Sequence, residues 1–164
     1  MQFGRRHENA PELRVLEWIG SDGRTLDTPL KLSDLGTGTK ILFAFQHGCP
    51  GCHSRGFPTL QTLHTALADR DFRFAAIQTV FESAKVNTSD KLRLNQERYH
   101  LPIPFGHDFP APGERHPTFM EDYRSAGTPW FTIIDPTGKI AFADFRLDVA
   151  RFLSALDREV LDIA

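Results

Sequence analysis

The sequence is poor in cysteine and has no long hydrophobic run, and both shortages narrow the class of protein. Only two of its 164 residues are cysteines. No stretch approaches the roughly 18 apolar residues that would span a bilayer, and the polar residues 1–13 lack the apolar core of a secretory signal. We therefore expect a cytoplasmic protein with no membrane partner.

The chain also has no large excess of positive or negative charge. The chain has 19 Lys and Arg residues against 21 Asp and Glu, for a net charge of −2, which gives no electrostatic reason to bind nucleic acid. There is no internal repeat, and a chain of this length with 40% hydrophobic residues suits one core. We expect a loose arm over residues 1–11 and a single domain over 12–164.

The order of periodic segments predicts an α/β fold with a mixed sheet and helices on both faces. The expected strands are a hairpin over 13–19 and 24–35, a buried strand over 41–45, and strands over 72–81, 103–107, 130–135 and 139–145. Three helices are expected over 50–69, with a kink at Pro58, over 89–100, capped by Ser89 or Asp90, and over 117–127, ending at Gly127. A C-terminal helix should begin at Asp148, and its apolar face should consist of Val149, Phe152, Leu153, Leu156, Val160 and Leu161.

Both cysteines lie in His-Gly-Cys-Pro-Gly-Cys-His-Ser, residues 47–54. Two cysteines three apart in a reducing compartment indicate catalysis or metal binding more than a structural disulfide. Cys49 follows a buried strand and opens a helix, where free N–H groups and the helix dipole stabilise a thiolate. Cys52 lies one turn further in, so Cys49 is the expected nucleophile and Cys52 the resolving thiol.

These features together resemble the thioredoxin fold: a strand, the C-x-x-C motif and a helix, then Gly-Thr-Pro before a strand, a hairpin and a last helix. The phrases LKLSDLGTGTKILFAF and TIIDPTGKIAF, the N-terminal hairpin and an insertion after the second core strand, at about 84–117, are more specifically similar to the TlpA/ResA-like thiol–disulfide oxidoreductases. The resemblance covers roughly residues 11–162. It implies a cis peptide before Pro129, a substrate chain hydrogen-bonded to the backbone of Thr128, and no cofactor beyond the redox-active disulfide Cys49–Cys52.

The chain departs from that family at several positions. Phe43 replaces the buried carboxylate six residues before the first cysteine, and Arg55 replaces the Glu that some members carry six residues after it. The kink proline, Pro58, comes one residue later than usual. We expect that His47, His53 and Arg55 either tune the dithiol or are ordinary solvated side chains. Trp130 either covers the dithiol or is packed.

Other interpretations of the same residues stay open. Cys49 to His53 also matches C-x-x-C-H, the motif for covalent haem attachment. A zinc site is a further alternative, in which the two cysteines join residues of the insertion: His100, His107, Asp108 and His116. We expect no metal, since the histidines show no ligand-like spacing.

Two further functions are alternatives. The peroxiredoxins share the fold, but neither cysteine here has their Thr three residues before it. A non-catalytic binding module is the other, with the Phe- and Pro-rich segment 101–117 as its docking loop. The interpretation we favour is a thiol–disulfide oxidoreductase that reduces a protein or small-molecule disulfide and is recharged by a thiol reductant or reductase.

Overall fold

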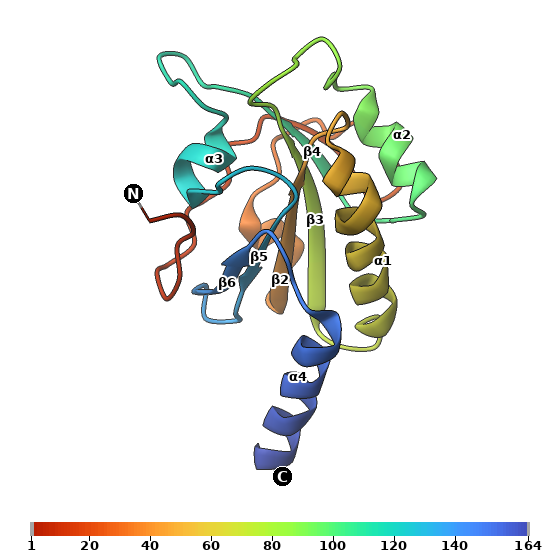
Figure 1. The fold of residues 1–164 in the computed structure, drawn as a ribbon, viewed down its shortest axis with the longest axis vertical. Helices are drawn as coiled ribbons and strands as arrows, with labels where there is room; N and C mark the ends of the chain where they lie inside the picture. The colour runs from red at the N-terminus through yellow and green to blue at the C-terminus, as the bar shows by residue number, and fades with distance from the viewer. Residues whose placement is uncertain (1, 164) are drawn as a thin grey trace.

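The computed structural model describes residues 2–163, and the side chains of residues 2–159. Within residues 2–163, six strands and four α-helices follow one another (Figure 1). The strands are β1 (Glu17–Ile19), β2 (Thr39–Phe45), β3 (Phe72–Thr79), β4 (Phe105–Asp108), β5 (Trp130–Ile134) and β6 (Ile140–Asp144). The helices are α1 (Phe57–Ala66), α2 (Lys91–Arg98), α3 (Thr118–Tyr123) and α4 (Val149–Ile163), with a 3-10 turn at Leu32–Leu35 and a π-helical turn at Cys52–Gly56.

The strands form one mixed sheet in the order β1-β4-β3-β2-β5-β6. β2, β3 and β4 are parallel to one another, whereas β1, β5 and β6 join antiparallel to their neighbours. β2 lies at the centre, and residues 40–46 are all buried. Because it has neighbours on both edges and cover on both faces, its side chains are a continuous apolar run instead of an alternating one.

Each face of the sheet carries its own apolar cluster, which confirms the predicted α/β layering. α1, α2 and α4 cover one face, over a cluster that includes Phe43, Phe45, Phe57 and Phe105. α3 and the N-terminal segment cover the other face, over a cluster that includes Trp18, Leu42, Phe119 and Trp130. Figure 1 shows α1 and α3 on opposite sides of the strands.

The predicted N-terminal hairpin is reduced to a turn. Only one bridge, Ile19 with Thr25, joins its two limbs, and β1 uses its other edge to pair with β4. Beyond Leu26, whose N–H donates to the carbonyl of Trp18 at 2.9 Å, the second limb leaves the ladder, and Leu30 and Leu35 turn into the second cluster. This part of the expectation was too regular.

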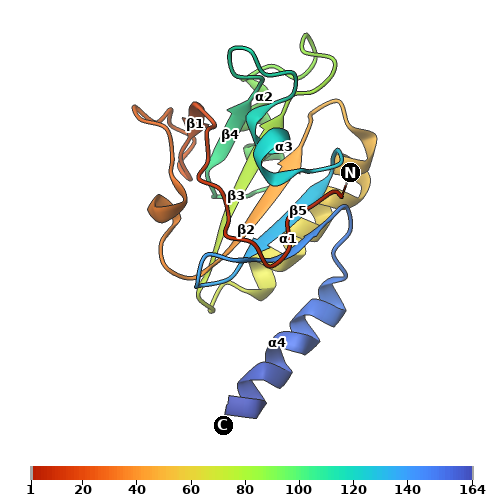
Figure 2. The same ribbon diagram turned by 90° about the vertical axis from the view of Figure 1, so that its left-hand side faces the viewer.

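The N-terminal arm, expected to be loose, is held against β6. His7 N–H donates to the carbonyl of Ile140 at 2.8 Å, Ile140 N–H donates to Glu8 at 2.9 Å, and Ala10 N–H donates to Gly138 at 2.8 Å. Figure 2 shows the arm running along this side of the sheet. The backbone groups of an edge strand are thereby paired within the chain.

Two helix ends also differ from expectation or refine it. α3 ends at Tyr123, four residues before the predicted Gly127, where Arg124 adopts the left-handed conformation of a C-cap; the carbonyl of Arg124 accepts the N–H of Gly4 at 2.8 Å. α4 begins as predicted, with the carboxylate of Asp148 accepting the N–H of Arg151 at 3.0 Å.

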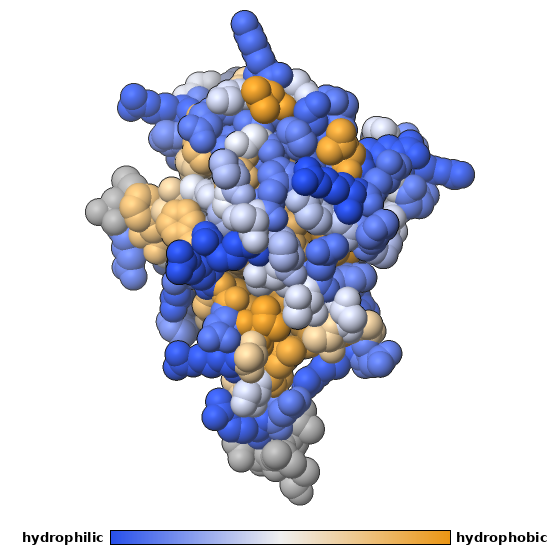
Figure 3. Space-filling model, turned by 45° about the vertical axis from the view of Figure 1, so that its right-hand side comes forward, coloured by the Kyte–Doolittle hydropathy of each residue, from blue (hydrophilic) through white to orange (hydrophobic). Residues whose placement is uncertain are grey.

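α4 leaves the sheet and extends beyond its end (Figures 1 and 2). Its residues Val149, Phe152, Leu153 and Leu156 pack partly against the first cluster, and Figure 3 shows a hydrophobic area on the surface where the helix departs. The side chains of Val160 and Leu161, predicted for the same apolar face, lie outside the described residues. Within residues 2–163, no helix has both the length and the apolar composition needed to traverse a bilayer.

Candidate active site around the dithiol

The two cysteines lie where β2 ends and the first helix begins. Both are free thiols, Cys49 half-buried and Cys52 fully buried. The N–H of Cys52 donates to the sulfur of Cys49 at 3.2 Å, and that sulfur lies 3.6 Å from the carbonyl oxygen of Thr128. Cys49, the accessible thiol, therefore lies at the N-terminal end of the helix, and Cys52 lies in the protein interior.

The two thiols have opposite acidities. A hydrogen bond from the Cys52 side chain, helped by the side chain of Thr128 and by the N–H groups of Cys52 and Gly51, lowers the pKa of Cys49 to about 6 against the opposing effect of burial. Burial, reinforced by the neighbouring Cys49, raises the pKa of Cys52 far above the ordinary value. At neutral pH the proton therefore belongs to Cys52 and the charge to Cys49, which is the distribution that makes Cys49 a nucleophile.

The Thr128–Pro129 peptide is cis, as the resemblance implied, and it faces the helix that carries the dithiol. A methyl group built on Gly51 would lie 3.5 Å from the Pro129 ring, an ordinary contact. One built on Gly56 would lie 2.9 Å from Pro129 and 2.8 Å from the Phe43 ring. At Gly56 the helix therefore comes closer to the sheet residue Phe43 and to Pro129 than it does at Gly51.

The late kink proline has a structural explanation in the π-helical turn. Phe57 N–H donates to the carbonyl of Cys52, five residues back, instead of to the residue four back. A π turn accommodates one additional residue within an α-helix. Pro58, which has no N–H to donate, directly follows this turn, so the extra residue between Cys49 and Pro58 is absorbed beside the dithiol.

His53 is held in a chain of hydrogen bonds. Its Nε2 lies 2.6 Å from the carbonyl oxygen of His47, and its Nδ1 lies 2.5 Å from the hydroxyl of Tyr99. Because a carbonyl only accepts, Nε2 carries the proton, and in neutral His53 the Tyr99 hydroxyl donates to Nδ1. Among the described hydrogen bonds, neither ring nitrogen of His53 contacts a cysteine sulfur.

His47 lies beside this chain, with its ring centroid 5.5 Å from that of His53. Its Nδ1 accepts a hydrogen bond of 3.1 Å from the side chain of Asn95. Burial, together with the nearby His53 and Lys91, lowers the pKa of His47. His47 is accordingly neutral at neutral pH.

The other two residues proposed to tune the dithiol are Arg55 and Trp130. Arg55 is exposed on the π turn, with its guanidinium 3.8 Å from the position that a Cβ on Gly51 would take. Trp130 is 3% exposed, belongs to the cluster on the opposite face of the sheet from Cys52, and packs edge-on against Phe145 with ring centroids 4.9 Å apart. The structure therefore places Trp130 as a packed residue and not as a cover for the dithiol.

Three buried amide side chains near the motif were missed by sequence reasoning. Gln46, Gln78 and Asn87 are 1%, 0% and 2% exposed. The side chains of Gln78 and Asn87 accept N–H groups of the loop that precedes Cys49, and the side chain of Gln46, in that loop, accepts the N–H of Phe81. The only sequence signal for the two glutamines is a polar residue at the end of an apolar strand, in FAFQ and AAIQT. That signal is also typical of ordinary strand ends.

The histidines considered for a zinc site are not gathered. His100 lies at the end of α2, His107 on β4, and His116 just before α3. Asp108 is buried and accepts hydrogen bonds from Thr118 and Phe119. Among the side chains that the structure describes, no three His, Cys, Asp or Glu residues are arranged as a metal site.

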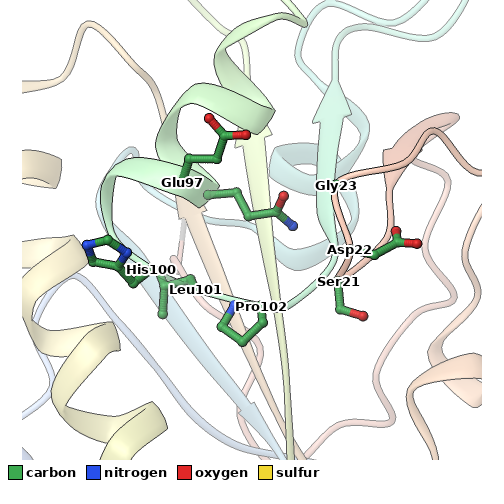
Figure 4. Close-up of a pocket in the computed structure, with 8 residues that line it drawn as sticks. Ser21, Asp22, Gly23, Glu97, His100, Leu101 and Pro102 are labelled. Atoms are coloured by element: carbon green, nitrogen blue, oxygen red, sulfur yellow. The ribbon is translucent and has the colours of Figure 1, made fainter.

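Two cavities lie near these elements. One, of about 560 Å³, lies between the turn at Ser21–Gly23 and the C-terminal end of α2, with Glu97 and His100 on its wall (Figure 4). It contains none of the residues predicted for the dithiol site. The other, of about 810 Å³, is lined by Phe3, Phe81, Met120, Ser125 and Ala126 among others, so it adjoins the loop that leads into Thr128.

Comparisons with solved structures identify the fold. A thioredoxin-like superfamily protein is 30% identical, with a TM-score of 0.76 over 90% of this chain and 92% of that one. A thiol-disulfide isomerase from Corynebacterium glutamicum is 29% identical, with a TM-score of 0.74 over 92% and 96%. The thioredoxin domain of a thiol-disulfide oxidoreductase from Bacteroides vulgatus, 18% identical with a TM-score of 0.63 over 88% and 91%, shares the fold. No protein-family model and no curated protein sequence matches the chain.

Proposed function

The chain belongs to the thioredoxin-like superfamily, and from this we propose that it is a thiol–disulfide oxidoreductase whose dithiol is Cys49 and Cys52. The observation that carries the proposal is the asymmetry of the two thiols. Cys49 is accessible and acidic at the head of a helix, while Cys52 is buried and keeps its proton. The similarity to a thiol-disulfide isomerase supports the same class of chemistry.

The reaction follows from these positions. The Cys49 thiolate attacks one sulfur of a substrate disulfide, which forms a mixed disulfide and releases the other substrate sulfur as a thiolate. Cys52 then loses its proton and attacks the Cys49 sulfur, which releases the second substrate thiol and leaves the Cys49–Cys52 disulfide. The substrate gains two electrons and the protein loses two. A dithiol reductant or a reductase restores the two thiols by the reverse exchange.

The cis Thr128–Pro129 loop is the proposed seat for the substrate backbone. Its carbonyl lies 3.6 Å from the Cys49 sulfur, so a chain bound along this loop would bring its disulfide next to the nucleophile. We further propose a cytoplasmic setting, in which exchange runs toward reduction of the substrate. No cofactor, nucleic acid or membrane enters this scheme.

Trapping tests the proposal directly. Cys52→Ser cannot resolve the mixed disulfide, so it should accumulate covalent adducts with oxidised substrates that disappear on treatment with a thiol reductant. Cys49→Ser is the matched control and should trap nothing. The wild-type protein should also catalyse reduction of insulin by dithiothreitol. Absence of adducts with Cys52→Ser, together with no insulin reduction, would leave a binding module as the better interpretation.

A further inference from the structure

The loop between β2 and the dithiol is bonded by side chains from a distant part of the chain. The N–H of His47 donates to the side-chain oxygen of Gln78 at 3.0 Å, and the N–H of Gly48 donates to the side-chain oxygen of Asn87 at 2.8 Å. Cys49 follows directly, with its own N–H bonded to the carbonyl of Gln46 at 3.0 Å. Three successive backbone N–H groups are therefore fixed immediately before the nucleophilic sulfur.

A side chain of the loop also accepts hydrogen bonds from the 81–88 segment. The side-chain oxygen of Gln46 accepts the N–H groups of Phe81 at 3.2 Å and Glu82 at 3.4 Å, and also the side-chain amide of Asn87 at 3.4 Å. The 81–88 segment and the 46–48 loop are thus tied in both directions. Close packing adds to this, since a methyl group on Gly48 would lie 3.2 Å from Val86.

Neutral amides suit these positions because each must accept and donate at once. The side-chain nitrogen of Asn87 donates to the carbonyls of Glu82 at 3.0 Å and Ser83 at 3.3 Å. That of Gln78 donates to the carbonyl of Thr88 at 3.0 Å and to the Nδ1 of His107 at 3.1 Å. A buried amide that lost these partners would be costly, so each side chain is held in one orientation.

We propose that Gln78 and Asn87 are positioning residues for the dithiol, which hold Cys49 in register with Cys52 and Thr128 by accepting the two N–H groups that precede it. The sulfur of Cys49 receives the Cys52 N–H at 3.2 Å and lies 3.6 Å from the Thr128 carbonyl. Hydrogen bonds weaken steeply with misalignment. A loop that is free to shift therefore loses the Cys52 N–H contact that stabilises the thiolate.

The inference rests on the proposed function, because it assigns the amides to the nucleophile of that reaction. Two charged side chains lie close to the same loop. Glu82 has a carboxylate oxygen 3.5 Å from the Gln46 amide nitrogen, and Lys91 lies near enough to His47 to lower its pKa. The variants proposed below leave both unchanged, so a shift in reactivity would not come from a change of charge.

The test compares Asn87→Ala and Gln78→Ala with Gln96→Ala. Gln96 is the control, because it is also a buried amide, 6% exposed, whose side chain is hydrogen-bonded to backbone. It donates to the carbonyls of Gly20 and Ile103 at 2.9 Å each, and neither carbonyl belongs to the motif. The rate of alkylation of the reduced protein by iodoacetamide is followed from pH 4 to 10. If the amides position Cys49, its apparent pKa should rise by about one unit in both positioning variants, a loss of about tenfold in rate at pH 5.

All three variants should lower the melting temperature, because each removes a buried amide, but Gln96→Ala should keep the wild-type pH profile. Asn87→Ser serves as a milder replacement should Asn87→Ala fail to fold. Profiles of the positioning variants that match wild type would overturn the inference and leave the proposed function intact. A wild-type profile like that of an ordinary thiol would instead remove the proposed function, and this inference with it.

Discussion

The backbone N–H of Cys52 points at the sulfur of Cys49 from 3.2 Å. The side chain of the same residue is the largest contributor to the low pKa of Cys49. One buried residue therefore supplies two of the donors that keep the nucleophile ionised, and in the proposed reaction it later attacks that nucleophile. Burial of Cys52, which keeps its proton in place until then, gives the two steps their order.

Replacement of Cys52 separates these two donors. Cys52→Ala keeps the backbone N–H but removes the thiol, so the pKa of Cys49 should rise from about 6 by about one unit or more. Cys52→Ser keeps a hydroxyl donor and should stay close to the wild-type value. The pH dependence of alkylation at Cys49 measures both. Equal profiles for the two variants would show that the side-chain donor has no role.

The stability of the reduced protein should depend on pH in a defined window. The folded pKa of Cys49, about 6, is below its ordinary value of 9.0, so between these values the unfolded chain binds a proton that the folded chain has lost. The free energy of unfolding should therefore rise from pH 6 to 9 and be lost as pH falls through 6. Above pH 9 the raised pKa of Cys52 should reverse the trend. Urea denaturation under reducing conditions checks this, and Cys49→Ser should lack the rise.

Gly51 and Gly56 lie on the same helix, and both are directed toward Pro129. Their alanine substitutions therefore form a matched pair. Gly56→Ala would place a methyl group 2.8 Å from Phe43 and 2.9 Å from Pro129, whereas Gly51→Ala would make only an ordinary contact at 3.5 Å. Both residues have helical backbone angles, so alanine is tolerated by the backbone at each. Gly56→Ala should lower the free energy of unfolding by about 1–3 kcal/mol and reduce exchange activity, while Gly51→Ala should do neither. Equal urea midpoints for the two variants would contradict the close approach at Gly56.

The elements that could be predicted from the sequence are those whose pattern is local. β2, β3 and the β5–β6 hairpin carry apolar runs bounded by turn residues, and the start of α4 has a local cap at Asp148. The arm could not be predicted, because its conformation depends on distant partners such as Ile140 and Gly138. The 24–35 segment instead turns Leu30 and Leu35 into the second cluster. A hydrogen bond between residues more than a hundred positions apart produces no periodic pattern in the sequence.

The same distinction applies to the site. Cys49 and Cys52 were recognisable from their spacing, and Thr128–Pro129 from its place before a strand. Asn87 was not, because its partner Gly48 is 39 residues away and a single asparagine in a loop has no distinguishing pattern. For Trp130, nearness to Pro129 in sequence left open whether it covers the dithiol or is packed, and strand alternation places it on the other face of the sheet.

Asp108 anchors the start of α3, and its two oxygens accept every donor that faces it. Thr118 donates through its N–H at 3.1 Å and its hydroxyl at 2.5 Å, Phe119 N–H donates at 2.9 Å, and the Thr79 hydroxyl donates at 3.2 Å. Asp108→Asn puts an amide nitrogen against two of these donors and should lower the free energy of unfolding by about 1–3 kcal/mol. Asp157→Asn, on the exposed face of α4, is the control and should have little effect. A urea midpoint for Asp108→Asn equal to wild type would show that the acceptor pair is dispensable.

His53 connects the dithiol helix to the loop before it, through the 2.6 Å hydrogen bond from its Nε2 to the carbonyl of His47. His53→Ala removes this tie, and we expect the alkylation profile of Cys49 to move to higher pH because the loop is less constrained. Tyr99→Phe is the discriminating partner variant, since it removes the hydroxyl bonded to Nδ1 and keeps the bond to His47. A shift with His53→Ala alone would assign the effect to the loop tie, and equal shifts in both variants would assign it to the hydrogen bond between His53 Nδ1 and the Tyr99 hydroxyl. If neither variant changes the profile, His53 has no part in tuning Cys49 and serves only to pack against Phe57 and Tyr99.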